Sequence, residues 1–231
     1  MKKKVFVALL ATVMVGTMLA GCGTPGSKSS NDRSSDGKVF RYSTNTEPTT
    51  LDPTKGNCIP DNEIQHAVTE SLVRNTGGEI TPGVAESWEV SDDGLTYTFH
   101  LNPDAKWSDG EQIKAQDFVY SWQRLMNPDT AAPYAFIGEY LKNGYAIEKD
   151  QMDPSELGVV AQDDTTLVVT LEHPTAYFLS LIGSSAQYAP LRQDIVEEYG
   201  KDFAADAEKN VYSGPYVLKS SQNQKWVFEP N

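Results

Sequence analysis

An alternation of apolar and polar residues between positions 88 and 101 is the clearest pattern along the chain. Apolar and polar residues alternate on both sides of an Asp-Asp-Gly turn, which predicts an antiparallel hairpin. His100 falls on the face opposite Tyr97 and Phe99, so we expect it to be an outward-facing strand residue and not a ligand. Similar short runs predict a second hairpin at 159–161 and 167–169, a strand pair at 216–218 and 226–228, and a strand at 39–43.

Apolar residues at helical spacing predict helices between these strands. The strongest stripe covers residues 115–126 and stops before an Asn-Pro pair. A second stripe covers 64–73, with Asp61 or Asn62 as its expected N-cap and a Gly-Gly pair beyond its end. Two shorter helices are predicted at 177–182 and 195–199. The interleaving of strands and helices indicates a mixed α/β (α+β) fold class.

The first 38 residues have the composition of an export signal followed by a tether. Three lysines at positions 2–4 precede an apolar run from 5 to 20, which is too short for a typical transmembrane span. The run ends in Leu-Ala-Gly-Cys, which resembles the bacterial lipobox and predicts a lipoprotein signal peptide at 1–21 and acylation of Cys22. The alternative is an uncleaved anchor with a chance cysteine. Residues 22–38 are rich in Ser and Gly and form the predicted tether.

Charge and composition exclude several functions. The chain of 231 residues carries a net charge of −13, which argues against a nucleic-acid partner because phosphate attraction needs Lys and Arg. Two cysteines do not make a disulfide scaffold, and three separated histidines do not suggest a metal site. No GxSxG, P-loop or HExxH motif is present, and Cys58 has no evident catalytic partner pattern. We therefore expect neither an enzyme nor a bound cofactor or metal.

Several motifs follow one another in a fixed order along the chain. They are Thr-Leu-Asp-Pro at 50–53, Pro-Gly-Val-Ala-Glu-Ser-Trp at 82–88, Leu-Thr-Tyr-Thr-Phe-His-Leu at 95–101, Ala-Lys-Trp-Ser-Asp-Gly at 105–110, Ala-Gln-Asp-Phe-Val-Tyr-Ser-Trp-Gln-Arg-Leu at 115–125 and Ser-Gly-Pro-Tyr at 213–216. In this order they resemble the family 5 solute-binding proteins, and within them the oligopeptide-binding proteins of bacterial ABC importers. The resemblance covers residues from about 39 to 231.

The resemblance implies a fold like that of the type II periplasmic binding proteins, here incomplete. Residues 39–66 and 191–231 would form parts of a first lobe, and 67–190 a family-specific inserted α+β lobe. The third lobe is expected to be absent, because the family is more than twice as long. The acidic residue that usually holds the amine of the ligand falls in that missing part. One departure is Lys114, which stands where the family has a capping Thr or Ser.

The resemblance also implies where a ligand would contact the chain. Asn57, Cys58 and Ile59 match the segment that pairs with peptide backbone, and Tyr134 matches an aromatic residue facing the cleft. The alternatives are a buried edge strand for Cys58 and Ile59 and simple packing for Tyr134.

The function that the resemblance implies is capture of oligopeptides and their delivery to ABC permease subunits. The protein would be a monomer, lipid-anchored on the extracytoplasmic face of the bacterial cell membrane. Two alternatives remain open. One is a lipid-anchored receptor for a pheromone or signal peptide, or an interaction protein on the same fold. The other is a binder of a non-peptide ligand such as a nickel chelate, haem or a sugar.

Overall fold

The structure, a computed structural model, describes residues 40–44 and 46–231 and divides into units 1–43 and 44–231. The predicted signal peptide, Cys22, the tether and Val39 lie outside the described residues. In the first unit, residues 40–43 have no regular structure, so the strand predicted there is wrong for these four residues. A strand needs a neighbour for its hydrogen bonds, and none of the described strands pairs with this segment.

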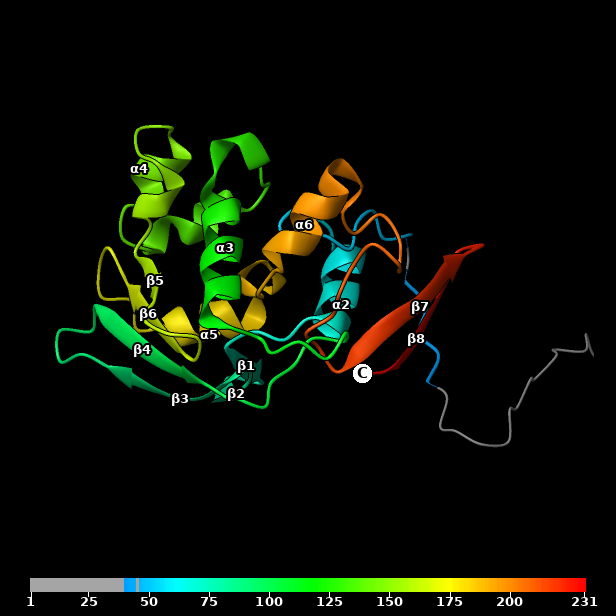
Figure 1. The fold of residues 1–231 in the computed structure, drawn as a ribbon, viewed down its shortest axis with the longest axis horizontal. Helices are drawn as coiled ribbons and strands as arrows, with labels where there is room; N and C mark the ends of the chain where they lie inside the picture. The colour runs from blue at the N-terminus through cyan, green and yellow to red at the C-terminus, as the bar shows by residue number, and fades with distance from the viewer. Residues whose placement is uncertain (1–39, 45) are drawn as a thin grey trace, which may run out of the picture. The chain divides into compact units, whose positions relative to one another are not determined.

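The second unit contains strands and helices in alternation along the chain (Figure 1). Its described α-helices are α2 (Ile59–Val68), α3 (Ala115–Met126), α4 (Gly144–Glu148), α5 (Phe178–Ser184) and α6 (Gln193–Tyr199). Its described strands are β1 (Val73–Thr76), β2 (Glu79–Pro82), β3 (Ala85–Val90), β4 (Thr96–Leu101), β5 (Val159–Ala161), β6 (Thr166–Thr170), β7 (Tyr216–Gln222) and β8 (Lys225–Pro230). Short 3-10 turns include η1 (Pro128–Thr130), η2 (Ala135–Tyr140), η3 (Pro154–Glu156), η4 (Ala186–Tyr188) and η5 (Gly200–Asp202).

The two predicted hairpins join into one antiparallel sheet. Its strand order is β3-β4-β6-β5, with Phe99 opposite Trp88 on one side and Leu167 on the other. Tyr97 and Phe99 are buried while His100 is only half-buried, as the alternation predicts. The strand pair β7–β8 is also confirmed. These strands are set by local pattern, because period-two alternation fixes which face each side chain takes.

Helix α3 begins and ends where the sequence predicts. Its apolar stripe, which includes Phe118 and Trp122, is fully buried. Lys114 occupies the N-cap without a side-chain hydrogen bond. Asp117 compensates by accepting from the Lys114 N–H at 2.9 Å and from Trp107 Nε1 at 3.0 Å. A carboxylate in the first helical turn can satisfy a free N–H even where the cap residue cannot.

The helix predicted at 64–73 is wrong in its boundaries. Helix α2 covers Ile59–Val68, with Cys58 at the N-cap in place of Asp61 or Asn62. Thr69 is extended and donates from both its N–H and its hydroxyl to the Gln65 carbonyl, which closes the helix. The apolar residues that continue the stripe belong to the start of β1, and the Gly-Gly pair turns β1 into β2.

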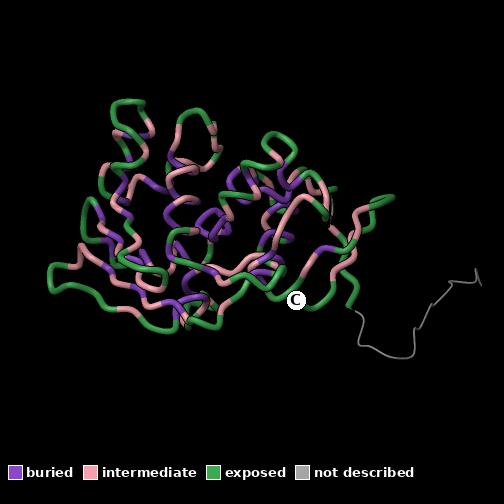
Figure 2. Tube along the Cα trace, viewed as in Figure 1, coloured by how far each residue is buried: buried purple, intermediate pink, exposed green. Residues whose placement is uncertain are grey.

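Buried apolar side chains form two clusters inside this unit. The larger cluster joins residues between Leu72 and Tyr188, around β4, β6, α3 and α5. The smaller cluster joins residues 51–68 to 191–218. Figure 2 shows the buried stretches along the trace. The predicted lobe boundaries at 66 and 190 stay a prediction.

Candidate functional site

The segment from Thr49 to Ile59, which leads into α2, is held by one buried carboxylate. Asp61 has no exposed surface and accepts hydrogen bonds from three main-chain N–H groups and from the hydroxyl of Thr49, besides the Cys58 thiol. Thr49 donates its N–H at 2.6 Å and its hydroxyl at 2.9 Å, Thr50 its N–H at 3.3 Å and Asn57 its N–H at 3.2 Å. One side chain thus ties both ends of the 49–59 segment to the first turn of α2.

The titration of Asp61 follows from these contacts. Burial alone would raise its pKa, but hydrogen bonds from Thr49, the Cys58 thiol and Asn57 favour the anion, and the pKa falls below the usual 3.8. Burial and the adjacent Asp61 raise the pKa of the Cys58 thiol. Cys58 is therefore a neutral thiol near pH 7, unsuited to nucleophilic chemistry.

A second buried residue of α2 supports the middle of the segment. Gln65, also fully buried, donates its Nε2 to the carbonyls of Asp52 at 3.1 Å and Thr50 at 3.3 Å. Gly56 lies so close to this amide that an added Cβ would approach Gln65 Nε2 and Oε1 to 2.5 Å. The segment therefore packs against α2 with no room for a side chain at position 56.

Two further side chains reach the segment from outside it. Arg124 of α3 forms a two-point ion pair with Asp52, at 2.9 and 2.7 Å, and its guanidinium lies 5.7 Å from the centre of the Phe203 ring. Gln187 of η4, which is 4% exposed, lies with its Nε2 3.5 Å from the Gly56 carbonyl oxygen and 3.4 Å from Asn62 Oδ1.

The end of the segment is exposed although its base is buried. Ile59 is 73% exposed, and Asn57 is exposed beside it. Cys58 has an extended backbone, with φ −132° and ψ 163°. Among the described residues, no donor reaches the Asn57 carbonyl and no acceptor reaches the N–H groups of Cys58 and Ile59. The chain here offers main-chain donors and an acceptor on a fixed backbone.

The fourth predicted contact residue lies elsewhere. Tyr134 precedes η2 and is half-buried against the larger cluster. The centre of its ring lies 5.5 Å from the centre of the Phe136 ring. No hydrogen bond or ring contact in the described part of the chain joins Tyr134 to residues 57–59. A role for Tyr134 in ligand contact stays a prediction, as does that of residues 57–59.

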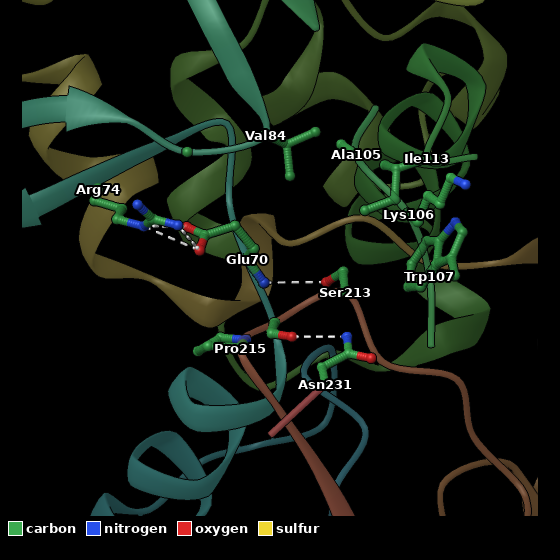
Figure 3. A pocket seen from close by; sticks show the side chains of 12 residues that line it. Glu70, Arg74, Val84, Ala105, Lys106, Trp107, Ile113, Ser213, Pro215 and Asn231 are labelled. Carbon is green, nitrogen blue, oxygen red and sulfur yellow. Dashed lines mark hydrogen bonds and ion pairs between the residues drawn. The ribbon is translucent and has the colours of Figure 1, made fainter. Parts of the chain in front are cut away.

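A cavity of about 360 Å³ lies away from all four of these residues (Figure 3). Arg74 in its wall is paired with Glu70, and the Glu70 N–H donates to Ser213 Oγ at 3.0 Å. Arg74 and Glu70 are thus paired with each other, and Lys106 is a second cation in the lining. We place the candidate site at residues 57–59, where main-chain groups have no partner among the described residues. The lining residues are Glu70, Arg74, Gly83, Val84, Ala105, Lys106, Trp107, Ile113, Ser213, Gly214, Pro215 and Asn231.

No group of three or more His, Cys, Asp or Glu residues in the described part lies as a metal site would need. None of its described helices is both long and apolar enough to cross a membrane.

Comparison with known proteins identifies the family. Residues 79–231 match the model of the bacterial extracellular solute-binding proteins, family 5. The chain belongs to this family. The periplasmic oligopeptide-binding protein OppA of Haemophilus influenzae is 40% identical to it over 189 residues, which are 80% of this chain and 35% of that protein. This family 5 chain therefore spans about a third of the length of that curated relative.

Solved structures of family 5 relatives agree with the fold. The substrate-binding domain of an oligopeptide ABC transporter from Bacillus anthracis superposes with a TM-score of 0.80 at 40% identity, over 83% of this chain and 37% of that one. The pheromone receptor PrgZ superposes with a TM-score of 0.77 at 32% identity, over 80% and 38%. The predicted fold class is confirmed as a mixed α/β structure that covers part of a solute-binding protein.

Sequence reasoning did not find the side chains that hold the candidate site. Asp61 was expected as a helix cap, and Gln65, Arg124 and Gln187 were given no role. The sequence offers one signal, which is that some of these polar residues lie on helices that also carry an apolar stripe. A polar residue at such a position can be assigned to a buried contact only after the fold is known.

Proposed function

We propose that the protein is a membrane-anchored lipoprotein that binds oligopeptides and delivers them to an ABC importer. The observation that carries the peptide-binding part is the pair of N–H groups and the carbonyl at 57–59, unpartnered among the described residues on a rigidly held, exposed segment. Support comes from the match to the oligopeptide-binding protein of Haemophilus influenzae. The lipobox at Cys22 supports the anchor.

The physical mechanism is addition of an extended peptide to this segment. Main-chain hydrogen bonds give affinity without depending on the side chains of the ligand, so peptides of many sequences are accepted. Each such bond contributes only about 0.5–1.5 kcal/mol. Because residues 49–58 are already fixed by Asp61 and Gln65, little further ordering of the protein is needed on binding.

Nuclear magnetic resonance on the whole chain tests this mechanism. The Cys22→Ser variant, made without lipid, is titrated with tetra-alanine and with the same peptide methylated on its backbone nitrogens. Three main-chain bonds on one wall contribute about 1.5–4.5 kcal/mol in all, and only the upper end of that range reaches a Kd of about 1 mM. We expect saturable amide shifts at Cys58 and Ile59 with tetra-alanine and none with the methylated peptide. Equal shifts with both peptides, or none at about 10 mM, would contradict the proposal.

The anchor is tested separately in bacterial cells. Labelling with a radioactive fatty acid should mark the natural chain and fail to mark Cys22→Ala. Label retained on Cys22→Ala would reject acylation at this residue while leaving the peptide-binding part of the proposal standing.

A signalling receptor is the second candidate, favoured by the structural likeness to the pheromone receptor PrgZ. It would hold one peptide sequence, whereas a transport protein holds a mixture. Mass spectrometry of peptides that co-purify with the protein from its natural host separates the two: many unrelated sequences support transport, and one dominant sequence supports signalling.

A further inference from the structure

Two of the side chains that hold the 49–59 segment come from far along the chain. Arg124 and Gln187 lie 72 and 131 residues from their partners Asp52 and Gly56. Both belong to the stretch 67–190, and the buried apolar side chains from Leu72 to Tyr188 in that stretch form the larger cluster. The segment itself belongs with the smaller cluster through Leu51. Contacts at both positions therefore cross from one cluster to the other.

Arg124 is suited to fix Asp52 in place. It extends from α3, whose apolar face is fully buried, so its backbone has little freedom. The two planar N–H groups meet both oxygens of the carboxylate, and the side chains of Arg124 and Asp52 are 15% and 7% exposed. A two-point contact sets orientation as well as distance, which a Lys ammonium cannot do.

Gln187 is fixed by its neighbours in η4. The Tyr188 hydroxyl donates to the Ile137 carbonyl at 2.6 Å, and Trp122 Nε1 donates to the Tyr188 carbonyl at 2.9 Å. Ser121 Oγ donates to the Ala189 carbonyl at 2.6 Å. The two residues that follow Gln187 are thus attached to α3 and to η2, and the Gln187 amide extends from this turn to the Gly56 carbonyl.

We propose that Arg124 and Gln187 are positioning residues through which the 67–190 stretch holds residues 57–59 in the conformation that pairs with peptide. This inference rests on the proposed peptide binding. The ligand touches neither side chain. The larger cluster then contributes to affinity indirectly, because a segment that is already ordered loses less conformational entropy when a peptide binds.

The test combines a variant pair with a matched control. The variants are Arg124→Lys, Gln187→Ala and the double variant, in the Cys22→Ser chain. The control is Arg192→Lys, because Arg192 also bridges carboxylates, at 3.0 Å to Asp109 and 2.6 Å to Asp194, but none in the 49–59 segment. Hydrogen exchange of the Thr49, Thr50 and Asn57 amides reports the order of the segment. The initial slope of the Ile59 shift against tetra-alanine concentration reports affinity.

We expect exchange of these three amides to rise about tenfold in the double variant, with exchange inside α3 unchanged, and the Ile59 slope to fall about tenfold, or about 1.4 kcal/mol. Arg192→Lys should change neither. Faster exchange with an unchanged slope would overturn the inference and leave peptide binding intact. Failure of the natural segment to respond to peptide would reject the proposed function itself. If Arg124→Lys does not fold, Gln187→Ala alone carries the test, with a smaller change in the same two measurements.

Discussion

The four-stranded sheet with α3 and the 49–65 region are both well buried, but different forces hold them. Around Phe99 and Trp122 the buried atoms are almost all apolar. Around Asp61 and Gln65 the buried side chains include these two polar ones, and both of them bond to main-chain groups. Apolar packing is non-directional and tolerates small rearrangements, whereas buried hydrogen bonds accept only one geometry.

The difference suits the two regions to different tasks. The sheet region supplies stability, since burial of large side chains is the dominant favourable term in folding. The 49–65 region uses directional bonds to hold Cys58 in an extended conformation, with its N–H, the Ile59 N–H and the Asn57 carbonyl unpartnered among the described residues. An apolar core beneath it would leave Thr49, Thr50 and Asn57 without acceptors for their N–H groups, which is costly in a buried place.

Removal of a large core side chain should have the largest effect on the free energy of unfolding. It tests whether the sheet region, and not the 49–65 region, supplies most of the stability. Trp122 is fully buried, packs edge-on against Tyr188 at 5.1 Å between ring centres, and donates to its carbonyl. We expect Trp122→Ala to lower the free energy of unfolding by about 3–5 kcal/mol in urea denaturation. Val160→Ala, at a side chain 59% exposed, is the control and should change it by less than about 0.5 kcal/mol. A loss below about 1 kcal/mol for Trp122→Ala would show that this core is not the stabilising region.

The sheet region could be predicted from local pattern, and the 49–65 region could not. The hairpin at 88–101 and the helix at 115–126 follow from periodicity alone, because each residue's face depends on its near neighbours. The predicted boundaries of α2 are wrong because Val68 and Leu72 lie four residues apart, a spacing that a helix also allows, while Thr69 ends the helix between them.

The family resemblance predicts residues 57–59 as the candidate site. The side chains that hold these residues in place become visible only in the structure. A pair such as Gly56 and Gln187 is separated by 131 residues, and nothing in either local sequence indicates the other. Gln65 lies on the same helix as the apolar Ile64 and Val68, so its burial becomes visible only once the 49–59 segment is placed against it.

Substitution of the buried carboxylate of Asp61 tests the 49–65 region. Its effect on the free energy of unfolding should be smaller than that of Trp122→Ala. Asp61→Asn keeps the shape of the side chain and removes the charge that its hydrogen bonds favour. Bonds to charged groups contribute about 1.5–3 kcal/mol each but are not additive, so we expect a loss of about 2–3 kcal/mol in the free energy of unfolding. Exchange of the Asn57 amide should rise more than exchange within β4, because the damage is local. Uniform loss across both regions would contradict the separation drawn here.

The pH dependence of the same variant sharpens this result. The folded pKa of Asp61 lies below its ordinary 3.8, so its contribution is fully present above that value and is lost as pH falls through the lower folded pKa. The difference in unfolding free energy between the natural chain and Asp61→Asn should therefore stay constant from pH 7 to about 5 and shrink below about 3.8. If this difference in unfolding free energy already disappears between pH 7 and 5, Asp61 is not held as the anion.

The smallest expected effect is a gain in the sheet region, at a helix N-cap whose side chain makes no capping hydrogen bond. Lys114 stands at the N-cap of α3 in an extended conformation, and its side chain pairs with Asp164 at 2.9 Å on the surface. The Asp117 N–H already donates to the Lys114 carbonyl at 3.0 Å, and a Ser at this position can share that donor, which contributes about 0.5–1 kcal/mol, whereas loss of the exposed ion pair changes stability little. We expect Lys114→Ser to raise stability by about 0.5 kcal/mol and the melting temperature by about 1–2 °C. Lys114→Ala, which loses the pair without adding a cap, should lower stability slightly. If both variants lose stability equally, Asp117 already satisfies the start of the helix, and α3 owes its position to packing alone.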